Sequence, residues 1–325
     1  MKKAGMISIM SLAGLSVTLT WGRSVAAESA GPADLLTLCL ATLPEARPDG
    51  IWATWSLAPA IILPMVLAVG LYVRGLVTQR AAHAAHRQTF ARSLYFTAGI
   101  GCLIIALVSP LCRMASTLAW AHMVQHVLLV VGAPLLLVLS RPGGTLVAGL
   151  PRRLRTKSFS WASAAAARSQ PHAYLIASFL LYGVNIWFWH VPALYEAALL
   201  DTGMHLLMYA SLLIVSLMFW HAVVETYRMP GSAAGTAAIL LFFTFLHTGG
   251  LGIFLTLSPR PWYPLMALRG GAWGILPLDD QRLAGLIMWI PMGGIYVVVA
   301  LAVLAQLIAT SGQLTNRKAS AVRPS

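Results

Sequence analysis

Seven long apolar stretches, separated by short polar connections, make up most of the pattern of hydrophobic and polar positions along the chain. Each stretch is close to the ~20 apolar residues that a helix needs to cross the hydrocarbon core of a bilayer. The pattern therefore predicts an all-α fold, a polytopic membrane protein built as a seven-helix transmembrane bundle. We expect the spans at residues 55–74, 93–111, 119–140, 172–190, 203–224, 235–257 and 284–308.

The two ends of the chain fall outside this bundle. Residues 1–27 are expected to form a signal peptide, because two lysines precede an apolar run and Ala27 closes a group of small residues that suits cleavage. An uncleaved first membrane helix is the alternative. Residues 28–54 then form an acidic N-terminal segment outside the cytoplasm, residues 55–308 the transmembrane domain and residues 309–325 a cytoplasmic tail.

The composition favours a membrane protein over a soluble one. Of the 325 residues, 58% are hydrophobic and 10% are charged, whereas soluble domains carry about 25% charged residues. The net charge of +13 does not indicate nucleic-acid binding, because the basic residues stand in the connections between spans, where they act as topology signals. Cys39, Cys102 and Cys112 have neither an even count nor a CxxC spacing, so we expect no disulfide framework and no thiolate metal site.

Basic residues are distributed unequally over the connections. Those that follow the first, third, fifth and seventh spans hold fourteen Lys and Arg residues, whereas the alternate connections hold five. Connections rich in Lys and Arg stay in the cytoplasm. We therefore expect a multi-pass protein of the bacterial inner membrane, with its mature N-terminus outside and its C-terminus in the cytoplasm.

This orientation gathers four histidines from three helices at the outer face. His122 and His126 are four residues apart near the outer end of the third span, on one side of the helix. His190 ends the fourth span and His205 begins the fifth. Ionisable residues at membrane depth usually serve function, so the four histidines predict a metal site. Hydrogen bonding between helices is the structural alternative for the His122–His126 pair.

Copper is the metal that suits these positions. Methionines accompany the histidines in the outer half of the spans, and thioether and imidazole donors together suit Cu(I) better than magnesium or calcium. Methionine also fills irregular gaps between helices, which is the alternative for each one alone. Asp280 is either a helix cap or an acceptor for a ligand imidazole. The residues expected to support the site are Met123, Met204, Met208, His247, Asp280 and Met288.

Three stretches resemble the signatures of a known family. The first is His122-Met123-Val124-Gln125-His126-Val127-Leu128-Leu129, followed by Ala133-Pro134-Leu135-Leu136. The second is Phe188-Trp189-His190-Val191-Pro192-Ala193-Leu194-Tyr195, and the third is Asp280-Gln281-Arg282-Leu283-Ala284-Gly285-Leu286-Ile287-Met288-Trp289. In this order they resemble the polytopic CtaG family of cytochrome c oxidase assembly factors, which is distinct from the single-span copper chaperone sometimes given the same name.

The resemblance implies a role in the maturation of haem–copper oxidase through copper supply. Its partners would be oxidase subunits or other oxidase assembly factors, within the membrane lipid. One departure limits what is carried over. After the histidine that matches His205, many members have a Glu-His pair where this chain has Met208-Tyr209. No role of that pair is assigned to this chain.

Residues and resemblance together predict a cytochrome c oxidase assembly factor that handles copper at the periplasmic face. No enzyme is expected, because the spans show no nucleophile–base pair, phosphate loop or paired catalytic carboxylates. Two other functions stay open. A haem-binding electron carrier would use histidines of neighbouring helices as axial ligands. A copper transporter would need polar groups through the inner half of the bundle, where His221 and Glu225 lie near the end of the fifth span.

Reporter fusions test the predicted orientation. A reporter active only in the periplasm should be active when fused after Asp201 and inactive when fused after Arg155, because the arginine-rich connections stay in the cytoplasm. Reporter activity is measured for both fusions and normalised to the amount of protein. The reverse pattern would contradict the orientation.

Overall fold

The computed structural model describes residues 36–80, 86–155, 171–228 and 232–321. The predicted signal peptide lies outside these residues. The described residues contain helices and no strand. In chain order the elements are η1 (Ile51–Ala53), α2 (Pro59–Arg80), α3 (His86–Leu107), α4 (Pro110–Ala115), α5 (Ala119–Val127), η2 (Leu128–Gly132), α6 (Ala133–Ser140), α7 (Pro142–Gly149), α9 (Pro171–His190), α10 (Pro192–Leu200), α11 (Thr202–Arg228), α12 (Ser232–Leu257), α13 (Pro264–Ala267), η3 (Gly271–Trp273) and α14 (Pro277–Ala321).

The long helices confirm the predicted all-helical membrane bundle. Among the described residues, six helical segments are long and apolar enough to cross a membrane, and the count becomes seven if α9 and α10, bent by 74° where they meet, form one span. α3 ends at Leu107 rather than near residue 111, because Ser109 caps the separate helix α4 by accepting a hydrogen bond from the Leu111 N–H at 3.2 Å. α14 begins before the predicted residue 284 and continues past residue 308, to Ala321.

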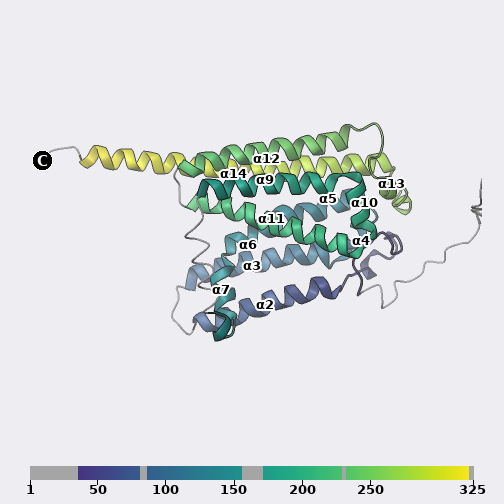
Figure 1. Cartoon of the computed structure of the whole chain (residues 1–325), viewed down its shortest axis with the longest axis horizontal. Helices are drawn as coiled ribbons and strands as arrows, with labels where there is room; N and C mark the ends of the chain where they lie inside the picture. Colours follow the sequence, from purple (N-terminus) through teal and green to yellow (C-terminus); the bar gives the residue numbers. More distant parts are fainter. Residues whose placement is uncertain (1–35, 81–85, 156–170, 229–231, 322–325) are drawn as a thin grey trace, which may run out of the picture.

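The membrane helices lie roughly parallel to the long axis of the molecule (Figure 1). α12 and α14 pack along each other on one side, and α2 lies on the other side beside α7. Glycine permits the close approach of α12 and α14: a Cβ added at Gly252 would lie 2.8 Å from the carbonyl oxygen of Gly285. Small residues at such contacts let helix backbones come close together in a membrane.

The third span is one continuous helical path with a π-helical turn inside it. α5 passes through η2 into α6 with helical backbone angles throughout. Pro134 has no N–H to donate to the carbonyl of Val130, one turn earlier. The indole N–H of Trp220 donates to that carbonyl at 2.9 Å, so α11 satisfies the group that the proline leaves free. The π turn follows directly after the turns of α5 that carry His122 and His126, and such turns are frequent at functional sites.

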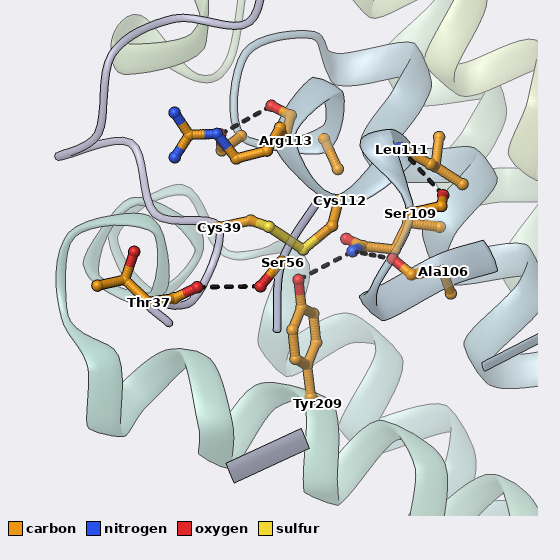
Figure 2. Close-up of a disulfide and its surroundings, with 12 residues drawn as sticks. Thr37, Cys39, Ser56, Ala106, Ser109, Leu111, Cys112, Arg113 and Tyr209 are labelled. Atoms are coloured by element: carbon orange, nitrogen blue, oxygen red, sulfur yellow. Dashed lines mark hydrogen bonds between the residues drawn. A yellow bond between two sulfur atoms is a disulfide. The ribbon is translucent and has the colours of Figure 1, made fainter. Parts of the chain in front are cut away.

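Cys39 and Cys112 form a disulfide, which Figure 2 shows between the segment before α2 and helix α4. The odd cysteine count led us to expect no disulfide framework, and the structure corrects this expectation by one disulfide. The two residues are 73 positions apart, and Cys102 is free. The odd number of cysteines and the wide spacing between Cys39 and Cys112 gave no sign of this pair. Its formation depends on how the segment before α2 packs across the bundle, which spacing does not reveal.

The segment before α2 closes one end of the bundle. We call this the disulfide end; it comprises residues 36–58, α4, α10 and residues 258–276. The N–H of Ala41 donates to a carbonyl of α10 at 2.8 Å. The guanidinium of Arg269 donates to the carbonyl of Ala41 at 2.6 Å, and the indole of Trp273 donates to the carbonyl of Ala46 at 2.7 Å. Arg269 and Ala41 are 228 positions apart, so this end joins the beginning of the described chain to its last third.

Removing the disulfide should destabilise the disulfide end. A Cys39→Ser, Cys112→Ser double variant loses a crosslink that closes a loop of 73 residues, and the loss of a native disulfide costs ~2–5 kcal/mol. We expect a lower midpoint of thermal unfolding for the purified variant. Cys102→Ser is the matched control and should unfold like the wild type, because Cys102 is free. Labelling of all three cysteines by a thiol reagent in the unreduced, unfolded wild-type protein would contradict the disulfide.

Candidate functional site

Three helices bring four histidine rings together near the disulfide end. α5 carries His122 and His126, His190 is the last residue of α9, and His205 lies in the first turn of α11. The ring centroids are 4.3 Å apart for His122 and His126 and 5.9 Å apart for His126 and His190. His205 lies near both histidines of α5. All four side chains are buried.

Backbone carbonyls orient three of the four rings. In each case Nδ1 lies 2.7–3.1 Å from a carbonyl oxygen, in the pairs His122–Ala115, His190–Ile186 and His205–Ala198. A carbonyl only accepts hydrogen bonds, so each of these Nδ1 atoms carries the proton and each Nε2 is left as the basic nitrogen. The Nε2 atoms of all four histidines are buried without a hydrogen-bond partner. Buried acceptors without partners are costly, so these four nitrogens are candidate ligand atoms.

A small cavity joins two of these histidines to three methionines. Its volume is about 10 Å³, roughly the space that one water molecule or one ion occupies. His126 and His190 line it together with Met123, Met288 and Met292. All three methionines are buried. Imidazole and thioether groups around one buried space form a donor set that suits Cu(I).

Asp280 holds the start of the helix that carries the histidine pair. Its buried carboxylate accepts hydrogen bonds from the backbone N–H groups of Ala119 and Trp120, at 2.8 and 2.9 Å. The first N–H groups of a helix have no partner within the helix, and a carboxylate is favourable at that end of the helix dipole. Of the two roles expected for Asp280, it therefore has that of a helix cap. The helix that it caps is α5, not its own helix α14. The ring N–H groups of His122, His190 and His205 bond to backbone carbonyls instead.

Tyr209 connects α11 to α5 beside the histidines. Its hydroxyl accepts a hydrogen bond from the side-chain amide of Gln125 at 2.9 Å, and the same amide donates to the carbonyl of Ala106 at 2.7 Å (Figure 2). The rings of Tyr209 and His205 have centroids 4.3 Å apart. At this position, where the chain departs from the Glu-His pattern, the side chain thus supplies ring packing and a hydrogen bond rather than a further imidazole.

Two tyrosines next to the histidines were missed in the sequence. Tyr195 lies edge-on to His122, with ring centroids 4.8 Å apart, and its buried hydroxyl has no hydrogen-bond partner. Tyr263 lies 4.3 Å from Tyr195 between ring centroids and donates its hydroxyl to the carbonyl of His190 at 3.1 Å. Burial raises the pKa of Tyr263, so this hydroxyl stays protonated. Tyr195 ends the second signature stretch, which was the available signal for it.

Some of the predicted supporting residues lie elsewhere. His247 of α12 packs against α9, where the indole N–H of Trp187 donates to its Nδ1 at 3.3 Å. Met204 and Met208 do not line the cavity, whereas Met292, which was not among the predicted supporting residues, does. In the described part of the chain, no three His, Cys, Asp or Glu side chains form a group that could hold a metal ion.

A protein-family model matches most of the bundle. Its description is cytochrome c oxidase caa3 assembly factor, Caa3_CtaG, and the match covers residues 70–310 of the 325-residue chain. The chain belongs to this family. The family expected from the three signature stretches is thereby confirmed. No curated protein and no solved structure matches the chain.

The region matched by the caa3 assembly factor model contains the whole candidate site. The four histidines, the cavity methionines and Asp280 all fall between residues 70 and 310. Of the disulfide, Cys112 lies inside this region and Cys39 lies before it. The segment that covers the disulfide end thus lies outside the matched region.

Replacing Asp280 by alanine should destabilise this caa3 assembly factor. The variant leaves the first N–H groups of α5 without an acceptor, and the loss of a helix cap costs ~0.5–2 kcal/mol. We expect a lower midpoint of thermal unfolding. Asp279→Ala is the matched control, because Asp279 is exposed and pairs with Arg282 at 3.2 Å within the same helix, an interaction worth at most ~0.5 kcal/mol. Equal midpoints for the two variants would contradict the capping role.

Proposed function

We propose that this caa3 assembly factor binds copper between α5, α9 and α14, outside the cytoplasm, and passes it to the oxidase during assembly. The observation that carries the proposal is the cavity in which His126 and His190 meet three methionines, with both Nε2 atoms buried and without partners. The family supports the role in oxidase assembly. The donor atoms support copper as the cargo.

The donor set favours Cu(I) over other metals. Zinc sites usually take three or four ligands from Cys, His, Asp and Glu, and the described residues offer no group of three such side chains. Magnesium and calcium require oxygen ligands, and the side chains that line the cavity are aliphatic, imidazole or thioether. Cu(I) accepts both imidazole and thioether ligands. In this proposal His126, His190 and the cavity methionines hold the ion.

A second pair of histidines extends the donor path toward the disulfide end. His122 lies one turn of α5 before His126, about 6 Å closer to the start of the helix. His205 lies near His122, and the Nε2 atoms of both are buried without partners. The carbonyls that bond to Nδ1 keep each Nε2 available as a ligand. The four Nε2 atoms would thus offer copper nitrogen ligands at two successive levels of the bundle.

Two independent features support a position outside the cytoplasm. The Cys39–Cys112 disulfide belongs to the same end of the bundle as the histidines, and disulfides persist in oxidising compartments. The connections at the opposite end hold most of the Lys and Arg residues, which is typical of the cytoplasmic side. Copper held at the disulfide end would thus be in reach of partners outside the cytoplasm.

The packing favours copper delivery over haem binding and over transport. A cavity of about 10 Å³ accommodates an ion and not a porphyrin. One to two helix turns beyond the cavity, toward the other end of the bundle, lies a fully buried aromatic cluster of Tyr182, Phe219, Trp220 and Tyr296. The hydroxyls of Tyr182 and Tyr296 bond to each other at 2.6 Å. This cluster offers no ligand path through the bundle, so copper would enter and leave at one face.

A double variant of the cavity histidines tests the proposal. His126→Ala with His190→Ala removes both imidazoles from the cavity. Affinity for Cu(I), measured by competition with a chelator, should fall by at least ~10–100-fold, the effect of losing a group that merely supports a ligand. A strain lacking the gene and carrying this variant should have low cytochrome c oxidase activity.

His247→Ala is the matched control. It removes a half-buried imidazole whose contacts are to α9, outside the cavity, and should keep wild-type copper affinity and oxidase activity. Wild-type copper affinity in a well-folded double variant would contradict the copper site. A Soret band in the purified wild-type protein would favour haem binding instead.

A further inference from the structure

A second cavity lies at the end of the bundle opposite the disulfide end. It has a volume of about 600 Å³, and we call it the arginine cavity. The charged and imidazole side chains that line it belong to Arg141, His221, Glu225 and Arg228. Arg141 directly follows the span that ends at Ser140, and Arg228 is the last residue of its span. The cavity therefore lies where membrane helices reach the level of the lipid headgroups.

We propose that the arginine cavity binds the phosphate group of an anionic phospholipid. The guanidinium groups of Arg141 and Arg228 hold the phosphate, and the apolar walls contact the acyl chains. The apolar walls include Leu137, Val138, Leu217 and Met218. This inference is independent of the copper function, because none of these residues lines the histidine cavity.

The charges in the arginine cavity favour an anion over a metal cation. Arg141 and Arg228 both reach the carboxylate of Glu225, at 3.6 and 3.0 Å. Two positive charges against one negative charge leave a net charge of +1 among the three groups, so the carboxylate does not neutralise both arginines. The fixed fork of guanidinium donors matches phosphate oxygens. Basic cavities between membrane helices on the cytoplasmic side are a recurrent form of anionic lipid site.

The backbone at Arg141 indicates that its side chain has a use. The residue has φ 50° and ψ 55°, and within the described ranges no other non-glycine residue has a positive φ. Glycine adopts this left-handed conformation without the steric cost of a Cβ. An arginine at a turn that glycine would make more easily suggests that the guanidinium contributes something in return. Here it adds a second positive charge beside Glu225.

The shape of the cavity suits a lipid better than a small soluble anion. Gly143 and Gly144 form part of the wall, and a Cβ added at either would meet no atom within 4 Å, so the space beside them is open. The hydroxyl of Tyr174 donates to the carbonyl of Met218 at 3.3 Å, which joins two helices of the wall. A water-soluble phosphate ester shares the phosphate chemistry, but it would leave the apolar walls wet, whereas acyl chains would cover them.

Thermal unfolding of the full-length protein in a neutral detergent tests this inference. Phosphatidylglycerol should raise the midpoint of unfolding and phosphatidylcholine should not. Arg141→Gln and Arg228→Gln should each weaken the apparent affinity for phosphatidylglycerol about fivefold, the effect of one basic residue near a headgroup. Glu225→Gln should strengthen it by a similar factor, because it removes the carboxylate that competes with the phosphate. If these residues had only a structural role, the arginine and Glu225 variants would not be expected to change the affinity for phosphatidylglycerol in opposite directions.

Arg152→Gln is the matched control, since Arg152 is an exposed arginine after α7 that does not line the cavity. It should leave the phosphatidylglycerol effect unchanged. Equal stabilisation by phosphatidylcholine, or an unchanged effect in both cavity arginine variants, would overturn the inference. Glycerol 3-phosphate tests a water-soluble phosphate ester in the same assay. If it reproduces the stabilisation and blocks that by phosphatidylglycerol, the lipid assignment is overturned.

The wild-type protein alone provides a second measurement, should the variants fail to fold. Lipid extracted from the purified protein should be enriched in anionic phospholipid relative to the membranes from which the protein was purified. High salt during purification should reduce this enrichment, because the guanidinium–phosphate attraction is screened. The same lipid composition in protein and membrane extracts would contradict the site.

Discussion

The histidine pair owes its position to one interaction between residues far apart in the chain. Asp280, at the start of α14, accepts hydrogen bonds from the backbone N–H groups of Ala119 and Trp120, at the start of α5. A buried carboxylate is costly without hydrogen bonds, and so are the buried N–H groups at a helix start, so each satisfies the other. The bond fixes α5 against α14 along their axes. Through this register His126 comes to share a cavity with methionines of α14.

Much of the fold could be predicted because a bilayer leaves few alternatives. Backbone groups at membrane depth must bond within their own helix, so apolar length alone located the helices. The same reasoning grouped the four histidines, since each lies near one end of its span. The break between α3 and α4 was missed, because apolar residues continue past it and Ser109 with Pro110 was a weak sign. The fourth span ends at residue 190 as predicted, whereas the helix α10 that follows it was not predicted.

The choice among similar residues required packing in three dimensions. His126 and His247 both lie inside apolar spans, yet the rotation of α12 turns His247 toward Trp187 of α9. Met288 and Met292 are one helix turn apart and line the same cavity, a spacing that the sequence already contained. The hydrogen-bond partners of the histidine ring N–H groups could not be predicted, because they are backbone carbonyls, which every residue type has. The disulfide could not be predicted either, because it depends on how the segment before α2 packs against α4 and α10.

That segment has a consequence for how the protein is completed. Residues 36–46 are synthesised before every described membrane helix, but their partners are in α4, in α10 and in the connection after α12. Contacts across more than two hundred positions form late, because the intervening chain must first be ordered. A chain that ended before α13 would have no Arg269 and no Trp273 to hold the segment. Residues 36–46 therefore complete their contacts only after α12 and the connection that follows it have been made, because two of their partners lie in that connection.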